Sequence, residues 1–187
     1  MQLIQERGIE RPVLCGHSMG GMLAAYIAKS RMLPLSSVLV LDSLLPLPET
    51  VRESHLKLAR DLGNGPYRDI FETFCADAFF LPDELGECSR SILSGMMSEP
   101  PEIAIGLLEE ICSLEFSKSL SDIEVPMHMV ASARGRLDLD SLRQYKPDAT
   151  GETMDGVGHF LTVFAWHRIS EVMRQAISGV PFPAGSC

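Results

Sequence analysis

Short apolar runs alternate with longer helix-forming segments along the first part of the chain. Residues 12–15 and 37–42 are apolar runs, and the second ends in Asp42. Uninterrupted apolar runs of this length are typical of parallel strands that are buried on both faces. The segment from about residue 20 to 31 is helix-forming, and a helix between two parallel strands predicts a right-handed βαβ unit. A short helix over residues 2–9 is expected before it.

The pattern changes between residues 46 and 121, where no strand is expected. Four helices are predicted instead, over about 48–62, 66–80, 83–98 and 101–115. Three of them begin at or next to a proline, which the first turn of a helix tolerates. Large apolar side chains gather in this segment: Phe71, Phe74, Phe79, Phe80, Met96 and Met97. Two interpretations stay open for them, the lining of a pocket and plain helix–helix core, and we expect core for most.

The strand pattern returns at residues 125–131, followed by a short helix around 138–145, a weak strand at 152–154 and a helix over about 162–177. The sequence therefore predicts an α/β fold in which a parallel sheet of about four strands is flanked by helices. Its core is expected to comprise residues 1–45 and 122–180, with a helical segment over 46–121 inserted between the second and third strands. A tail over 181–187 is expected to fray.

Composition narrows the class of protein. At 187 residues, with 45% hydrophobic and 22% charged residues, the chain is long enough for one domain with a sizeable core. Its net charge of −9 argues against a nucleic-acid or anionic-membrane partner. No apolar run approaches the roughly 20 residues of a membrane span, and the first residues lack the pattern of a signal peptide. Five scattered cysteines without CxxC spacing indicate reduced thiols, so a cytoplasmic protein without disulfides is expected.

A glycine-rich turn follows the first predicted strand directly. It reads Gly16-His17-Ser18-Met19-Gly20-Gly21, which contains Gly-X-Ser-X-Gly between a strand and a helix. This pattern is typical of a nucleophile elbow, in which a serine sits on a tight, strained turn with its hydroxyl above the sheet. Glycine is expected at positions 16 and 20 because a side chain there would collide with the neighbouring strand or helix. Ser18 is therefore the candidate nucleophile, and the alternative is an ordinary glycine-rich turn.

A serine hydroxyl needs a base within hydrogen-bond reach, and the best candidate is His159. It follows the weak strand and a glycine-containing turn, so it can extend over the sheet toward the serine. The other histidines fit less well: His17 belongs to the turn, His55 lies among charged residues and is expected in solvent, His128 is mid-strand and expected in the core, and His167 is on the last helix. No pair of histidines has metal-ligand spacing, so no metal is implied. A serine nucleophile with a histidine base implies no cofactor either.

Two motifs resemble the serine α/β-hydrolase superfamily. They are Gly16-His17-Ser18-Met19-Gly20-Gly21 and Gly156-Val157-Gly158-His159-Phe160, at the places where that family has its nucleophile and its catalytic histidine. The resemblance implies that the inserted helices form a cap over an active site. It also implies a partial α/β-hydrolase fold, with about strands five to eight of the family and without the strands that precede them. The first strand would then be an exposed sheet edge through which the chain could self-associate.

The catalytic acid is less clearly marked. Most members of the family carry it in the turn after the seventh strand, but here residues 131–136 contain no acid, and Gly135 or a neighbouring arginine occupies the expected position. Asp42, at the end of the second predicted strand, is the preferred candidate, because a minority of the family, thioesterase domains among them, place the acid there. Asp138 or Asp140 could serve instead, although both look like residues that stabilise the first turn of a helix. The remaining alternative is a weakened dyad without a working acid.

The resemblance implies hydrolysis of an ester-like bond by Ser18, His159 and Asp42 through an acyl-enzyme. The backbone N–H of Met19, at a helix N-terminus, would be one oxyanion donor. The second donor normally follows the family's third strand, and this sequence has no counterpart of it. The expected partner is a small-molecule substrate with an acyl or aryl group. Two other interpretations are a thioesterase that acts on a carrier-bound acyl chain and a non-catalytic remnant of the fold.

Overall fold

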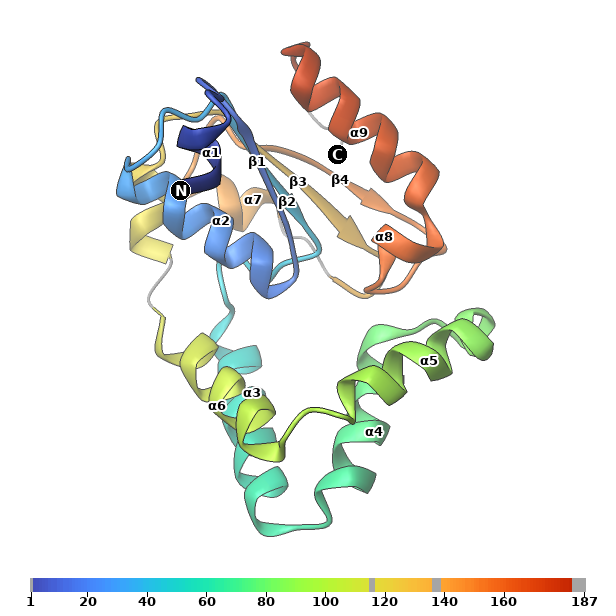
Figure 1. Ribbon diagram of the computed structural model, residues 1–187. Helices are drawn as coiled ribbons and strands as arrows, with labels where there is room; N and C mark the ends of the chain where they lie inside the picture. Colours follow the sequence, from blue (N-terminus) through green and yellow to red (C-terminus); the bar gives the residue numbers. More distant parts are fainter. Residues whose placement is uncertain (1, 115–116, 136–138, 183–187) are drawn as a thin grey trace.

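The computed structural model describes residues 2–114, 117–135 and 139–182 (Figure 1). At its centre is a sheet of four parallel strands in the order β1-β2-β3-β4: β1 is Val13–His17, β2 is Ser37–Leu41, β3 is Met127–Ser132 and β4 is Thr150–Met154. The helices, in chain order, are α1 (Gln2–Glu6), α2 (Met19–Ser30), α3 (Glu49–Asn64), α4 (Tyr67–Phe79), η1 (Pro82–Glu84), α5 (Glu87–Met96), α6 (Pro101–Ser113), η2 (Ser117–Asp122), α7 (Leu139–Arg143), α8 (Leu161–Phe164) and α9 (Trp166–Ser178).

Helices cover both faces of the sheet, which explains why β2 is apolar without interruption. Side chains alternate between the two faces of a strand. Val38 and Val40 belong to a buried cluster with α2, η2 and α7, whereas Leu39 and Leu41 belong to a second cluster with α8 and α9. Figure 1 shows the same division, with α2 and α7 on one side of the sheet and α9 on the other.

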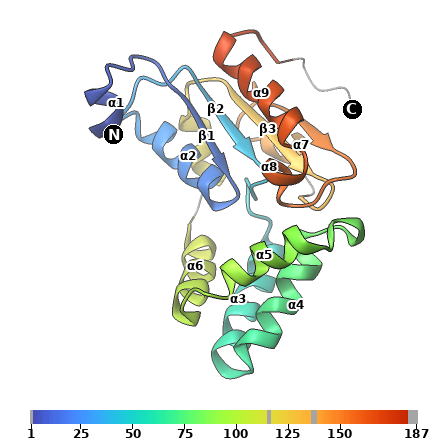
Figure 2. The same cartoon turned by 45° about the vertical axis from the view of Figure 1, so that its right-hand side comes forward.

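Helices α3 to α6 form a separate layer, inserted between β2 and β3, which we call the cap. In Figure 1 the cap lies below the sheet, beyond the carboxyl ends of the strands, and Figure 2 shows this arrangement from a second direction. The cap has a small core of its own, in which Leu62, Phe71, Cys75, Phe80 and Leu93 are buried. The chain segments that follow the strands therefore face the cap.

The parallel sheet of four strands with flanking helices confirms the fold class predicted from the sequence. Three elements differ most from the prediction. The helix expected over residues 83–98 is divided into η1 and α5, because Leu85 and Gly86 adopt extended backbone conformations. The final helix is divided at Ala165, whose ψ of 30° interrupts the helical bonds between α8 and α9. The last strand is longer than expected and begins at Thr150.

The first strand forms one edge of the sheet. Among the described strands β1 pairs with β2 alone, and its residues are only half-buried. An edge strand presents a row of backbone groups that another strand can bond. Self-association through this edge stays a prediction.

The turn after β1 requires glycine at two positions, and only one of them was predicted. A Cβ atom on Gly16 would overlap the backbone carbonyl of Gly20, and one on Gly21 would overlap the hydroxyl of Ser43. At Gly20, by contrast, a Cβ atom would meet nothing within 4 Å, so the expectation of a collision at this position is wrong. The close approach of α2 to the sheet therefore depends on Gly16 and Gly21.

We expect Gly16→Ala to lower the free energy of unfolding by roughly 2 kcal/mol, because the overlapping backbone can make room only if α2 shifts. Urea denaturation followed by circular dichroism measures this loss. Gly106→Ala is the matched control: Gly106 lies inside α6 with nothing within 4 Å of the added Cβ. That substitution should raise stability by up to about 1 kcal/mol. A Gly16→Ala variant as stable as the wild type would contradict this account of the turn.

His128 is buried in β3, as predicted, with 4% of its surface exposed. Its Nδ1 shares a hydrogen bond of 2.8 Å with Thr150 Oγ1, and the ring of Phe182 stacks on it at 3.6 Å. Its Nε2 has no hydrogen-bond partner among the described residues, since Glu152 Oε1, at 3.9 Å, is out of reach. Burial lowers the pKa of His128 to about 4, and the nearby Glu152 only partly opposes this effect.

Stability should therefore fall in mild acid. The unfolded chain protonates His128 near its ordinary pKa of 6.5, and the folded chain only at about 4, so between these values the unfolded state binds more protons. We expect His128→Gln, which keeps a polar group beside Thr150, to reduce the loss of unfolding free energy between about pH 7 and about pH 5 by about 2 kcal/mol. Urea denaturation at both pH values measures this difference. An identical pH dependence in variant and wild type would contradict a buried, neutral His128.

Candidate active site

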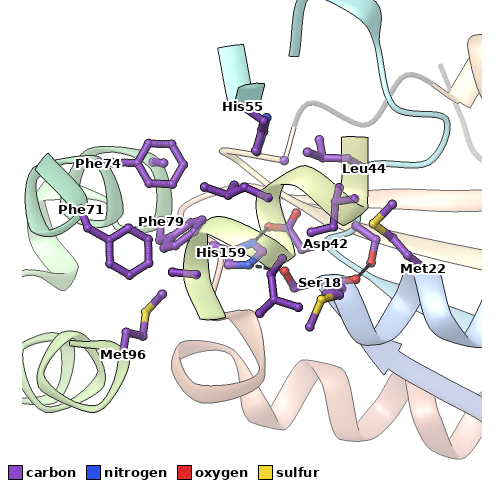
Figure 3. Close-up of a pocket in the computed structure, with 18 of the residues that line it drawn as sticks. Ser18, Met22, Asp42, Leu44, His55, Phe71, Phe74, Phe79, Met96 and His159 are labelled. Carbon is purple, nitrogen blue, oxygen red and sulfur yellow. Dashed lines mark hydrogen bonds and ion pairs between the residues drawn. The ribbon is translucent and has the colours of Figure 1, made fainter. Parts of the chain in front are cut away.

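Ser18 lies on the turn between β1 and α2 in a strained backbone conformation. Its φ of 54° and ψ of −126° belong to a region that residues with a Cβ atom rarely adopt. The turn is held by β2 and the residues after it: the Ser18 N–H donates to the carbonyl oxygen of Leu41 at 2.8 Å, and the hydroxyl of Ser43 donates to the carbonyl oxygen of Ser18. These bonds offset the strain and leave the Ser18 side chain beyond the carboxyl end of the sheet (Figure 3).

The three predicted catalytic side chains are brought into one hydrogen-bonded series (Figure 3). The Nε2 of His159 lies 2.9 Å from Ser18 Oγ, and its Nδ1 lies 2.7 Å from Asp42 Oδ2. An ionised carboxylate only accepts hydrogen bonds, so Nδ1 carries the proton and Nε2 is left to accept the serine proton. A general base next to a serine nucleophile requires this tautomer. The arrangement therefore has the geometry of a Ser-His-Asp triad.

Asp42 is buried, with 2% of its side chain exposed. Its carboxylate accepts from the Ser132 N–H at 2.6 Å, from the Ser132 hydroxyl at 2.9 Å and from His159. Its own N–H donates to the carbonyl oxygen of Val130 at 2.7 Å. A buried carboxylate without such donors would be costly, so these bonds hold the Asp42 side chain in place facing the histidine. Ser132 was not predicted, and its position at the end of the strand beside Asp42 is the signal that could have revealed it.

Of the other candidate acids, Asp140 does not join this network. Asp140 is an exposed residue in the first turn of α7, with no hydrogen bond to the histidine or to Asp42. This fits the helix-stabilising role considered for it, since a carboxylate in the first turn of a helix is favourable. Asp138 lies outside the described residues.

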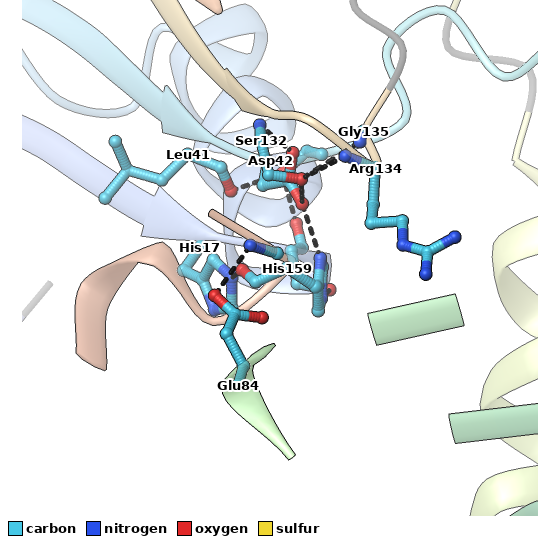
Figure 4. Close-up of polar contacts among 11 residues, drawn as sticks. His17, Leu41, Asp42, Glu84, Ser132, Arg134, Gly135 and His159 are labelled. Atoms are coloured by element: carbon cyan, nitrogen blue, oxygen red, sulfur yellow. Dashed lines mark hydrogen bonds and ion pairs between the residues drawn. The ribbon is translucent and has the colours of Figure 1, made fainter. Parts of the chain in front are cut away.

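The turn after β3, the alternative place for the acid considered above, leaves room for the Asp42 side chain. A Cβ atom on Gly135 would overlap the Asp42 carboxylate, so this position can hold no side chain while Asp42 occupies the space. The guanidinium of Arg134 points away from Asp42 and donates to the carbonyl oxygen of Phe80 at 3.0 Å (Figure 4). The Asp42 carboxylate therefore fills the space that a side chain at position 135 would need.

His17 has a larger part in the site than its place in the turn indicated. Its Nε2–H donates to the carbonyl oxygen of His159 at 2.8 Å, and the two rings are 4.7 Å apart. Burial lowers the pKa of His17, and the neighbouring His159 acts in the same direction. A neutral His17 thus helps to fix the main chain that carries the candidate base.

His55 was expected in solvent, and this prediction is wrong. The ring is half-buried in the cap, lies against Phe74 and lines a cavity above Ser18. Its Nδ1–H donates to the carbonyl oxygen of Val51 at 2.7 Å, which leaves Nε2 of the neutral ring as an acceptor. His167, by contrast, is exposed and lies on the last helix, α9, as predicted.

The cavity, of about 460 Å³, lies between the end of the sheet and the cap, with Ser18, Asp42 and His159 among the residues that line it (Figure 3). Its other walls are mostly apolar, with Met22 and Leu44 from the core and Phe71, Phe74, Phe79 and Met96 from the cap. Of the six cap residues whose role was left open, these four line the cavity, while Phe80 and Met97 do not. All six belong to or pack against one hydrophobic cluster, so the four cavity residues have both roles.

Met19 is the first residue of α2, directly after Ser18. A backbone N–H in this position has no acceptor within its helix, and it lies at the positive end of the helix dipole. It is therefore available to an anion that forms at Ser18. Its role as an oxyanion donor stays a prediction.

Two kinds of feature are not found in the part of the chain that the structure describes. No group of three or more His, Cys, Asp or Glu side chains could hold a metal ion there. Likewise, no helix within the described ranges is long and apolar enough to cross a bilayer.

Comparison with protein families places the chain in a class. A sequence model of the alpha/beta hydrolase family matches residues 2–172, so the chain belongs to this family. No curated protein sequence matches it significantly.

Solved structures share the fold at low sequence identity. MenH from S. aureus is 17% identical, with a TM-score of 0.72 over 95% of this chain and 71% of that one. A thermophilic esterase from Thermogutta terrifontis is 17% identical, with a TM-score of 0.75 over 94% of this chain and 68% of that one. The enol-lactonase from Burkholderia xenovorans LB400 is 15% identical, with a TM-score of 0.69 over 94% of this chain and 69% of that one. The chain thus spans about 70% of the length of these structures.

Proposed function

We propose that this chain hydrolyses an ester-like bond of a small acyl or aryl compound through an acyl-enzyme. The observation that carries the proposal is the hydrogen-bonded series Ser18–His159–Asp42 beside an apolar cavity. An ordinary glycine-rich turn would need neither a serine in a strained conformation nor a buried carboxylate that is hydrogen-bonded to the histidine. Membership of the alpha/beta hydrolase family supports hydrolysis as the reaction class.

In the proposed reaction, Ser18 Oγ attacks the substrate carbonyl carbon while His159 Nε2 takes the hydroxyl proton. Asp42 stabilises the resulting imidazolium, and the Met19 N–H stabilises the oxyanion, a contribution of a few kcal/mol per donor. The proton then passes from His159 to the leaving group, and the acyl group stays on Ser18. A water molecule, deprotonated by His159, attacks the acyl carbon, releases the carboxylic acid and restores the serine.

The cavity supports an apolar acyl or aryl group as the part of the substrate that is bound. Burying apolar surface contributes about 25 cal/mol per Å², and pockets of a few hundred Å³ are typical of small-molecule sites. The rings of Phe74 and Phe79 and the side chain of Met96 face this space. His55 Nε2 adds one acceptor that a polar substituent of the substrate could meet.

A thioester is the second candidate substrate. The position of Asp42 after β2 favours it, because this placement of the acid is the one that resembles thioesterase domains. Rates for an oxygen ester and a thioester of the same acyl group distinguish the two. A much higher kcat/KM for the thioester would select the second candidate.

The first prediction of the proposed function concerns Ser18. A fluorophosphonate should phosphonylate its hydroxyl with loss of fluoride, because His159 removes the proton during attack. Mass spectrometry of the intact protein and of its peptides measures the stoichiometry and the site. Ser18→Ala, matched in size, should remain unlabelled. If the folded wild type does not react while an active serine hydrolase does under the same conditions, the chain is a non-catalytic form of the fold.

The second prediction concerns the acid. Asp42→Asn should lower the rate of ester hydrolysis roughly 10³- to 10⁴-fold, because the amide favours the wrong histidine tautomer. Asp140→Asn makes the same chemical change at an exposed position away from the site and should stay within about twofold of the wild type. Esterase assays with matched protein concentrations compare the two. Equal activity of Asp42→Asn and the wild type would remove Asp42 from the triad.

A further inference from the structure

The loop that carries His159 is bonded to one short segment of the cap, residues 79–84. The His159 N–H donates to the carbonyl oxygen of Phe79 at 2.7 Å. The preceding N–H, of Gly158, donates to Oε1 of Glu84 at 2.8 Å. Two consecutive amides of the catalytic loop are thus satisfied by the cap and not by the sheet.

Glu84 is arranged to hold this loop. Its Oε2 accepts from the Leu81 N–H at 2.8 Å, and its own N–H donates to the Leu81 carbonyl oxygen at 3.0 Å, so the turn η1 is closed by its own carboxylate. The second carboxylate oxygen is left to Gly158, and Figure 4 shows the Glu84 side chain pointing to the His159 loop. A Cβ atom on Gly158 would overlap both Glu84 and the carbonyl oxygen of Phe79. Glycine at 158 therefore permits a contact that any other residue would disturb.

The side chain of the base is also held from the cap. The ring of Phe79 stacks on the imidazole of His159, with centroids 4.7 Å apart and planes inclined by 25°. On the core side of the same segment, Arg134 donates to the carbonyl oxygen of Phe80. The segment is thus bonded to the turns after both β3 and β4.

We propose that Glu84 is a positioning residue, whose carboxylate ties the cap to the loop of His159 and so orients the imidazole between Ser18 and Asp42. The inference rests on the proposed function, in which His159 is the general base. Proton transfer depends steeply on geometry, since a displacement of about 1 Å can reduce a rate about 10²-fold. The cap therefore completes the catalytic arrangement in addition to forming the cavity.

The test uses Glu84→Ala, which removes both acceptors, and Glu84→Gln, which keeps one. Asp83→Asn is the control, because it removes a carboxylate from an exposed position in the same turn. In fluorophosphonate inactivation, Glu84→Ala should lower the maximal rate constant roughly 10- to 100-fold with an unchanged inhibitor constant and full final stoichiometry. Glu84→Gln should lie between this variant and the wild type, and Asp83→Asn should match the wild type. Partial unfolding would reduce the stoichiometry instead of the rate constant.

A second measurement does not require turnover. A strongly hydrogen-bonded imidazole N–H gives a proton resonance far downfield, and the His159 Nδ1–H bond to Asp42 should give one, assigned by its loss in Asp42→Ala. This resonance should persist in Asp83→Asn and be lost or broadened in Glu84→Ala. If it is present and unchanged in Glu84→Ala, the positioning role is wrong, and its absence from the wild type would equally overturn it.

The two measurements separate the two proposals. A wild type that is not labelled but shows a Glu84-dependent resonance would refute the proposed hydrolase activity and support the positioning role of Glu84. A wild type that is labelled at the same rate as Glu84→Ala would support the activity and refute the inference.

Discussion

The site depends on one constraint, the burial of a carboxylate at the junction of three strand ends. Asp42 is almost wholly removed from solvent, and a charge in that position is tolerated only when its oxygens are bonded. Its donors come from Ser132 at the end of β3 and from His159 after β4, while its main chain bonds to β3. Satisfying one carboxylate therefore fixes the relative positions of β2, β3 and the histidine loop. The elbow is attached to the same place through Leu41 and Ser43.

The cap and the core contribute different physical properties to the cavity. The core supplies the three candidate catalytic side chains, each on a segment that follows a strand and each restrained by main-chain bonds. The cap supplies most of the apolar walls, and its own small core keeps residues such as Phe71 in place. The contacts between the two at Phe79 and Glu84 link the walls of the cavity to the orientation of the His159 ring.

Much of the fold could be predicted because its signals are local. Burial on both faces requires the uninterrupted apolar run of β2. Close approach of two backbone segments requires glycine in the turn at Ser18. Both requirements can be read directly from the sequence. The start of the helix predicted over residues 83–98 was misplaced. Leu85 and Gly86 break the helix there without a strong local signal.

Contacts that depend on tertiary structure were harder to predict. Glu84 and the cavity position of His55 depend on residues far apart in the sequence, and no local pattern distinguishes them from surface polar residues. Ser132 was marked only by its position at the end of a strand. Gly20 shows the opposite case, in which a motif position was assigned a steric role that its open surroundings do not support.

The position of Asp42 directly after β2 limits where a whole cap can be exchanged to alter the range of substrates. With an acid after β3, a graft could be joined well away from the triad. Here Asp42 is followed at once by the segment that leads into α3, and Ser43 within that segment is bonded to the elbow. The upstream junction of any transplanted cap must therefore lie between Leu44 and Glu49, and the graft must bring its own equivalent of Glu84. The activity of such chimeras will therefore depend more on the junctions between core and cap than on the shape of the transplanted helices.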